Sequence, residues 1–221
     1  MARFQETQWS IIERAGNDRD ALDALCRTYR PVVVAWFGRR GLSREVAEDY
    51  TQSFFARLLE KKTIDSADPS RGRFRTFLLT SVRNFYLNEL AKQSAQKRGG
   101  DQQHVPYEDD GIASDSPQDA FDRDFAAVLL AKALHRMEEE AIAAGRGELF
   151  RHLRPFLIEA PDRNDYDKLT AVLEMRRNTV AVAIHRMRAR LREAALEELR
   201  ETVSSEAAFQ AELDALKHSI G

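Results

Sequence analysis

The sequence predicts an all-α protein with two small helical domains, a flexible acidic linker between them and an amphipathic C-terminal tail. Three observations support this prediction. The 221 residues include only 10 Gly and 6 Pro. Apolar residues recur at helical spacing in several long segments, and no stretch alternates apolar and polar residues as strands do. A chain of this length has room for two domains with cores of their own.

The domain limits follow from where the helical periodicity stops and restarts. Between the two periodic parts, the chain is rich in Gly, Asp and Ser, which predicts a linker. We expect the first domain, the linker, the second domain and the tail at residues 7–95, 96–117, 118–199 and 200–221. The tail places Phe209, Leu213 and Leu216 at helical spacing. We expect it to pack on the second domain, with occlusion of another surface as the alternative.

Charge is unevenly distributed although the net charge is only −2. Residues 71–98 are strongly basic, with Glu89 as their only acid, whereas residues 101–124 are acidic, with Arg123 as their only Arg or Lys. Cys26 is the only cysteine, which excludes an intramolecular disulfide and a multi-cysteine zinc site. The five histidines are scattered, so we expect no metal, no cofactor and no catalytic site.

No apolar run is long enough to cross a bilayer, and the N-terminal residues lack the order of a signal peptide. We therefore expect a cytoplasmic protein that is not associated with a membrane.

Residues 164–192 read as two amphipathic helices joined by a tight turn, which is typical of a helix-turn-helix. The inner positions of the second helix are Val180, Ile184, Met187 and Leu191. The turn and the second helix also carry donors for phosphates and base edges: Arg176, Arg177, Asn178, His185, Arg186, Arg188, Arg190 and Arg192. This clustering predicts a reader of duplex DNA, and the alternative is a surface helix with solvated arginines.

Residues 73–95 predict a second helix that binds nucleic acid. Its inner stripe is Phe74, Leu78, Val82 and Phe85. The remaining face mixes aromatics, cations and amides, a mixture that suits unpaired bases and the backbone that joins them. Alternatively, its aromatic residues belong to the core.

Residues 45–59 form another amphipathic helix with an apolar opposite side that includes Phe55. Either this side binds a partner or a third helix covers it.

Three segments in this order resemble a bacterial RNA polymerase sigma factor of the extracytoplasmic-function (ECF) family, reduced to its second and fourth conserved domains. AEDYTQSFFARLLE (47–60) looks like the clamp-docking helix, and FRTFLLTSVRNFYLNELAK (74–92) is similar to the promoter-melting helix. YDKLTAVLEMRRNTVAVAIHRMRARLRE (166–193) matches the final helix-turn-helix in length and register. The resemblance covers most of residues 20–199. It implies core RNA polymerase, through its β′ clamp and β flap, and promoter DNA as partners, and no catalysis by this chain.

The resemblance also implies site residues. Polymerase binding is expected at Glu48, Asp49, Gln52, Ser53, Phe55 and Arg57. Binding of the minus-ten element is expected at Arg71, Arg73, Arg75, Phe77, Arg83, Asn84, Asn88 and Lys92. Binding of the minus-thirty-five element is expected at Arg176, Arg177, Asn178, Thr179, His185, Arg186 and Arg188.

The chain departs from the family pattern in the helix-turn-helix. Glu174 stands where a turn glycine is usual and Arg176 where a capping serine is usual, so Asn178 or Thr179 is an alternative cap. Ala181, Val182 and Ala183 replace polar residues.

The clamp-docking helix departs as well, because its usual run of acids is incomplete at Thr51 and Ser53. Phosphorylation of Thr51, or else of Ser53, by a Ser/Thr kinase would restore negative charge. The alternative for Thr51 is a hydroxyl bonded back to its own helix.

Two other functions compete with a monomeric sigma factor. One is an autonomous helix-turn-helix regulator that acts as a dimer and places two reading helices one duplex turn apart on a palindrome. The other is an enzyme such as a nuclease, which we rank last for lack of a metal-ligand pattern.

Overall fold

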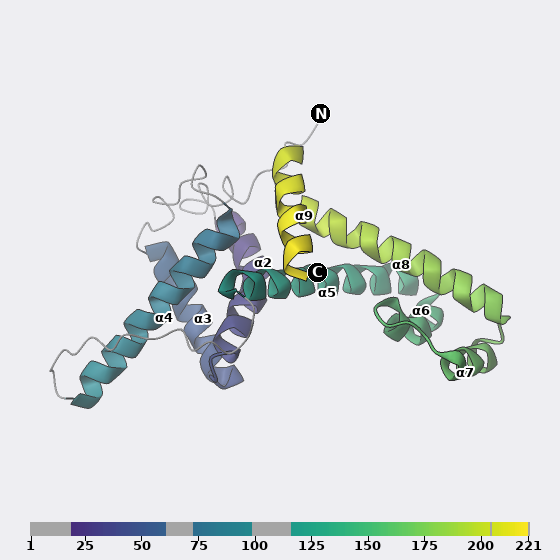
Figure 1. The fold of residues 1–221 in the computed structure, drawn as a ribbon, viewed down its shortest axis with the longest axis horizontal. Coiled ribbons are helices and arrows are strands. Elements are labelled where there is room, and N and C mark those ends of the chain that lie inside the picture. The colour runs from purple at the N-terminus through teal and green to yellow at the C-terminus, as the bar shows by residue number, and fades with distance from the viewer. Residues whose placement is uncertain (1–18, 61–72, 99–115, 204, 221) are drawn as a thin grey trace. The chain divides into compact units, whose positions relative to one another are not determined.

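The computed structural model describes residues 19–60, 73–98, 116–203 and 205–220 (Figure 1). These residues form helices and turns and contain no strand, so the predicted all-α class is confirmed. The chain divides into two compact units. Unit 1 comprises the residues up to Ala126 together with those from Val203 onward, and unit 2 comprises Ala127–Thr202. In the described part, no helix is long and apolar enough to cross a membrane.

Unit 1 is built around an aromatic core. Its described helices are α2 (Arg19–Gly38), α3 (Arg44–Glu60), α4 (Phe74–Arg98), the first part of α5 (Pro117–Ala143) and α9 (Glu206–Ile220). The predicted inner stripe of α4 is confirmed, because all four of its side chains are buried. Rings from several helices meet edge to face, a favoured geometry for aromatic pairs, as between Trp36 and Tyr86 or Phe37 and Tyr50.

The compact units differ from the expected domain limits in two places. Helix α5 contributes its residues up to Ala126 to unit 1, although the second domain was expected from residue 118. Helix α9, the expected tail, belongs to unit 1 and not to the unit that precedes it in the chain. In addition, α4 continues to Arg98, three residues beyond the expected end of the first domain. Residues 7–18 of that domain and 99–115 of the linker lie outside the described residues.

Unit 2 consists of the second part of α5, α6 (Gly147–Leu153), the short 3₁₀ helix η2 (Arg154–Leu157), α7 (Arg163–Leu173) and α8 (Arg177–Arg200). Its apolar side chains form two clusters. One cluster joins α5, α6 and η2 to the second half of α8 around Met137, Phe150 and Leu191. The other joins α6 and α7 to the first half of α8 around Leu153, Leu169 and Ile184. The predicted inner face of α8 is therefore confirmed, because Val180, Ile184 and Leu191 are buried and Met187 packs against both clusters. On α7, Leu169 is buried and Val172 is 59% exposed.

The connection between α7 and α8 is short and strained. Asp162 begins α7 with a capping box, in which its side chain accepts from the backbone N–H of Asp165 and the Asp165 side chain accepts from the N–H of Asp162. Glu174 ends α7 in the left-handed region at φ 51°. Arg176 occupies the N-cap of α8 without a capping side-chain hydrogen bond, so neither Asn178 nor Thr179 shifts the start of this helix. Both departures noted in the sequence thus occupy the turn and cap positions that favour Gly and Ser.

Replacing Glu174 with glycine is expected to stabilise unit 2 by about 1 kcal/mol, because glycine adopts a left-handed backbone without the steric cost of a Cβ. For a domain of this size, that raises the melting temperature by roughly 4–8 °C. Calorimetry and hydrogen exchange of the α7 and α8 amides measure the change. Glu174→Ala is the control, because it removes the same charge but keeps the Cβ. An equal gain in both variants would contradict the strain at this turn.

Candidate functional site

Helix α3 presents a narrow polar face. Asp49, Gln52 and Ser53 are exposed and lie three and four residues apart, so they share one side of the helix. Glu48 is half-buried at the edge of this face, where it accepts from Arg30 at 3.2 Å and from Arg44 at 3.3 Å. These residues form the α3 face, a surface with acid and amide groups that suits a basic protein partner.

Two expected polymerase contacts do not belong to the α3 face. Phe55 is only 6% exposed and packs edge to face on Phe54, with ring centroids 5.2 Å apart. Phe55 is therefore a core residue, which is the alternative that the apolar pattern left open. Arg57 is half-buried and donates to Glu89 of α4 at 3.2 Å. Its guanidinium thus links α3 to α4.

Thr51 is fully buried, and its hydroxyl donates to the Ala47 carbonyl at 2.7 Å. This is the back-bonded threonine that stood as the alternative to phosphorylation. A kinase has no access to this hydroxyl in the folded unit, and a phosphate would place about −1.5 to −2 charges in the core. The structure therefore argues against Thr51 as the phosphorylated residue. Ser53, the second choice, is exposed on the α3 face.

Helix α4 presents an exposed polar stripe on the side away from its buried residues. Its expected minus-ten residues are Arg83, Asn84, Asn88 and Lys92, all of them exposed. Asn84, Asn88 and Lys92 recur every fourth residue and so follow one line along the helix. Lys92 also contacts Glu89 at 2.6 Å. These four residues form the α4 stripe. Phe77 is only half-buried beside Phe74, with ring centroids 6.0 Å apart. Arg71 lies outside the described residues.

Arg75 is not available to DNA, in contrast to the expectation. Its side chain is 1% exposed, and its Nε donates to Asp122 of α5 at 3.0 Å. Its Nη2 lies 2.7 Å from Glu212 of α9 without meeting hydrogen-bond geometry. The guanidinium also lies over the Phe125 ring, 4.6 Å from the centroid. Arg73 is partly engaged by the same group of charges, because it donates to Asp122 at 3.2 Å.

Burial changes the pKa of two groups near Arg75. Removal from water raises the pKa of the Glu212 carboxyl, and the cations Arg75 and Arg73 act in the opposite direction. Burial likewise raises the pKa of the Tyr29 hydroxyl, so Tyr29 is neutral at physiological pH. Helix α9 contributes a further bond to this region, since Arg123 donates to the Ser219 carbonyl at 3.1 Å. The group is therefore an internal charge cluster that fastens α4, α5 and α9 together.

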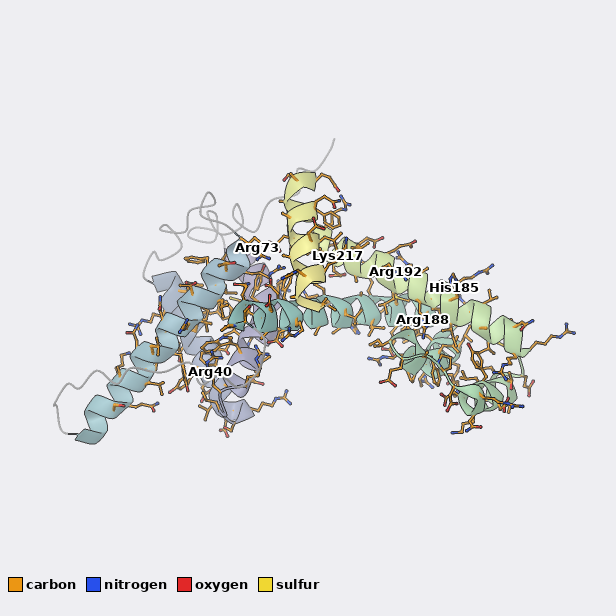
Figure 2. All side chains as sticks on the ribbon, in the orientation of Figure 1. Arg40, Arg73, His185, Arg188, Arg192 and Lys217 are labelled. Carbon is orange, nitrogen blue, oxygen red and sulfur yellow. The ribbon has the colours of Figure 1, made fainter. Side chains whose placement is uncertain are left out.

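Helix α8 carries the candidate residues for duplex DNA, of which His185, Arg188 and Arg192 are labelled in Figure 2. Six expected minus-thirty-five residues are exposed at or after the start of the helix: Arg176, Arg177, Asn178, Thr179, His185 and Arg186. Only Arg177 has a described side-chain partner that constrains it. Its guanidinium lies 4.7 Å from the Tyr166 ring centroid and 3.7 Å from the Asp167 carboxylate. These six residues form the α8 face.

Arg188 has a different role from the one expected. Its Nε donates to the Phe156 carbonyl at 2.9 Å, and its Nη2 donates to the Glu159 carbonyl at 2.7 Å. It therefore satisfies two carbonyls at the end of η2 and holds that segment on α8. Arg190 is also occupied, since its guanidinium contacts Glu140 and Glu197 at 3.4 and 3.2 Å.

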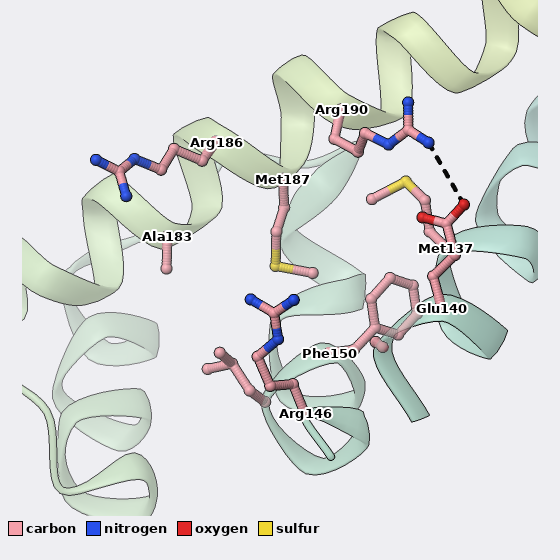
Figure 3. A pocket seen from close by; sticks show the side chains of 10 residues that line it. Met137, Glu140, Arg146, Phe150, Ala183, Arg186, Met187 and Arg190 are labelled. Carbon is pink, nitrogen blue, oxygen red and sulfur yellow. Dashed lines mark hydrogen bonds and ion pairs between the residues drawn. The ribbon is translucent and has the colours of Figure 1, made fainter. Parts of the chain in front are cut away.

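Unit 2 also contains a pocket of about 370 Å³. Figure 3 shows Met187 pointing from α8 toward Arg146 and Phe150, and Arg190 joined to Glu140. Apolar side chains line most of the pocket, and Arg146 and Arg186 are exposed at its lining. An apolar surface with cations beside it suits an amphipathic, acidic protein segment.

Asp122 and Glu212, the two carboxylates that pair with the buried Arg75, were not predicted from the sequence. No local signal identifies them, because they lie 47 and 137 residues further along the chain. No group of His, Cys, Asp and Glu in the described part of the chain has an arrangement that could hold a metal.

Comparison with known proteins identifies the class of the first unit. Residues 25–96 match the family model of sigma-70 region 2, over a range that contains α3 and most of α2 and α4. No curated protein and no solved structure matches the chain.

The chain therefore carries a sigma-70 region 2, the module with which sigma factors bind RNA polymerase and recognise promoters. Residues 25–96 are thus similar to the corresponding region of the sigma-70 family of sigma factors.

Proposed function

We propose that this chain is a sigma factor of the ECF type, with unit 1 acting as sigma domain 2 and unit 2 as sigma domain 4. The observation that carries this proposal is the region 2 match, because it covers both the α3 face and the α4 stripe. The second support is the helix, short turn and cationic helix of unit 2, an arrangement typical of helix-turn-helix proteins.

In this proposal, the two units divide promoter recognition between them. The α8 face enters the major groove of the minus-thirty-five element, where its cations anchor phosphates and each bidentate base contact adds about 1–3 kcal/mol of discrimination. The α4 stripe holds unpaired bases of the minus-ten element. Extruding a base from the duplex costs a few kcal/mol, so the contacts of the stripe and of Phe77 have to offset that cost.

The partner is core RNA polymerase, which performs the chemistry. We propose that the β′ clamp binds the α3 face through Asp49, Gln52 and Ser53, and that the β flap binds the apolar pocket of unit 2. The free chain is a monomer that binds promoters weakly, because the contacts of its two units are combined only on the polymerase.

The region 2 match favours this proposal over an autonomous dimeric regulator, since such a regulator has no need of a module for polymerase binding. A regulatory kinase that acts on Thr51 is not part of the proposal, because that hydroxyl is buried.

Two arginines that are two residues apart on α8 provide a test of the DNA-binding role. Arg186→Ala is expected to weaken binding of the holoenzyme to duplexes of all sequences and to reduce the salt dependence of binding by about one counterion, while the stability of unit 2 stays unchanged.

Arg188→Ala is the control, and it is expected to destabilise unit 2 by about 1.5–3 kcal/mol, because two charge-assisted hydrogen bonds to carbonyls are lost. Binding assays from 50 to 200 mM salt, combined with thermal unfolding, separate the two effects. Unchanged affinity and an unchanged salt slope in Arg186→Ala would contradict the assignment of the α8 face.

A further inference from the structure

Val182 occupies a position on α8 that packing does not explain. Its side chain is 49% exposed, whereas the apolar residues on the opposite side of the helix, Val180 and Ile184, are buried. It lies four residues after Asn178 and three before His185, both of which are exposed. Residues at this spacing share one side of a helix. Val182 is therefore at the centre of the α8 face, between two side chains that can donate or accept hydrogen bonds.

The chemistry of this central position is restricted. The residues next to Val182 in the sequence, Ala181 and Ala183, are short and carry no hydrogen-bonding side chain. A valine at a base edge neither donates nor accepts a hydrogen bond, and it leaves unsatisfied any polar group that it buries. In the major groove, thymine is the base that offers an apolar group, its C5 methyl.

We infer that Val182 is a specificity-determining residue that contacts the C5 methyl of a thymine in the minus-thirty-five element. This inference rests on the proposed function of unit 2 and deepens it. The charge of the surrounding face supports duplex DNA as the ligand, since Arg176, Arg177 and Arg186 are exposed on the same part of the unit.

Replacing single thymines by uracil tests the inference, because uracil lacks only the methyl group. Duplexes that bind the holoenzyme of the full chain and core RNA polymerase are first selected from a random library. Each thymine of the enriched element is then replaced in turn. At one or two positions, uracil is expected to weaken binding roughly fourfold, the effect of uncovering about one methyl group.

Val182→Ala is expected to bind the thymine duplex roughly fourfold more weakly and to bind the thymine and uracil duplexes equally well. This variant is expected to fold, because the side chain is exposed and alanine favours the helix. Val172→Ala is the matched control. It removes the same groups from an exposed valine of α7 in the same unit, and it is expected to keep the preference for thymine.

The outcomes separate this inference from the function on which it rests. Loss of the thymine preference in Val182→Ala alone supports the contact. An enriched element that tolerates uracil at every position, or a preference that persists in Val182→Ala, overturns the contact but leaves the proposed function. Failure to enrich any duplex element overturns both.

Discussion

Replacing Asp122 with alanine is expected to destabilise unit 1 by about 3–5 kcal/mol, because it leaves the buried Arg75 guanidinium without its hydrogen-bonded counterion. Glu212 still lies 2.7 Å from Arg75 in this variant's native geometry, but that contact lacks hydrogen-bond geometry and does not replace the hydrogen bond from Asp122. The free energy of unfolding of a small domain is only about 5–15 kcal/mol. A loss of this size is therefore expected to leave the variant partly unfolded at 37 °C.

Urea unfolding followed by tryptophan fluorescence measures this effect, because both tryptophans of the chain, Trp9 and Trp36, precede unit 2. Arg44→Ala is the control. It breaks an ion pair with Glu48 on an exposed side chain and is expected to cost less than about 0.5 kcal/mol. A loss in Asp122→Ala no larger than in this control would show that the charge cluster does not hold unit 1 together.

Replacing Phe209 with alanine is expected to destabilise unit 1 by about 3–5 kcal/mol and to leave unit 2 unchanged. Phe209 is 3% exposed on α9, which belongs to unit 1 although it lies at the far end of the sequence. Truncation of a buried aromatic side chain removes its apolar burial and leaves a cavity. Because α9 also contributes Glu212 to the charge cluster, its loosening further exposes Arg75.

Fluorescence unfolding reports on unit 1, and hydrogen exchange of the α7 and α8 amides reports on unit 2. His218→Ala, an exposed position on the same helix, is the control and is expected to stay within about 0.5 kcal/mol of the native chain. Destabilisation of unit 2 in Phe209→Ala, with unit 1 unchanged, would instead assign α9 to unit 2, as predicted for the tail from the sequence.

The features predicted correctly from the sequence are those governed by local periodicity. The inner stripes of α4 and α8 are examples, because helical spacing of large apolar residues determines which side of a helix is buried. The strain at Glu174 was also predictable from the sequence, because glutamate stands at a turn position where the left-handed backbone favours glycine.

The errors at the candidate site have a common physical cause, which is tertiary contact between distant segments. Arg75 is a cation in a basic segment, which is typical of DNA-binding residues. It has a structural role instead, because α5 and α9 pack against α4 and place Asp122 and Glu212 beside its guanidinium. Arg188 stands in a run of exposed cations, yet carbonyls some 30 residues earlier in the chain bind its guanidinium. Helical spacing places such residues on a side of the helix and does not identify what lies opposite.

Transcription by core RNA polymerase with and without the chain tests the central claim most directly. The templates are a library of random duplex fragments, and the 5′ ends of the transcripts are mapped. As a sigma factor, the chain is expected to add transcripts that start at defined positions and share elements near minus ten and minus thirty-five. If the chain adds no such starts and fails to bind core polymerase, yet binds a palindromic duplex as a dimer, the account is contradicted in favour of an autonomous regulator.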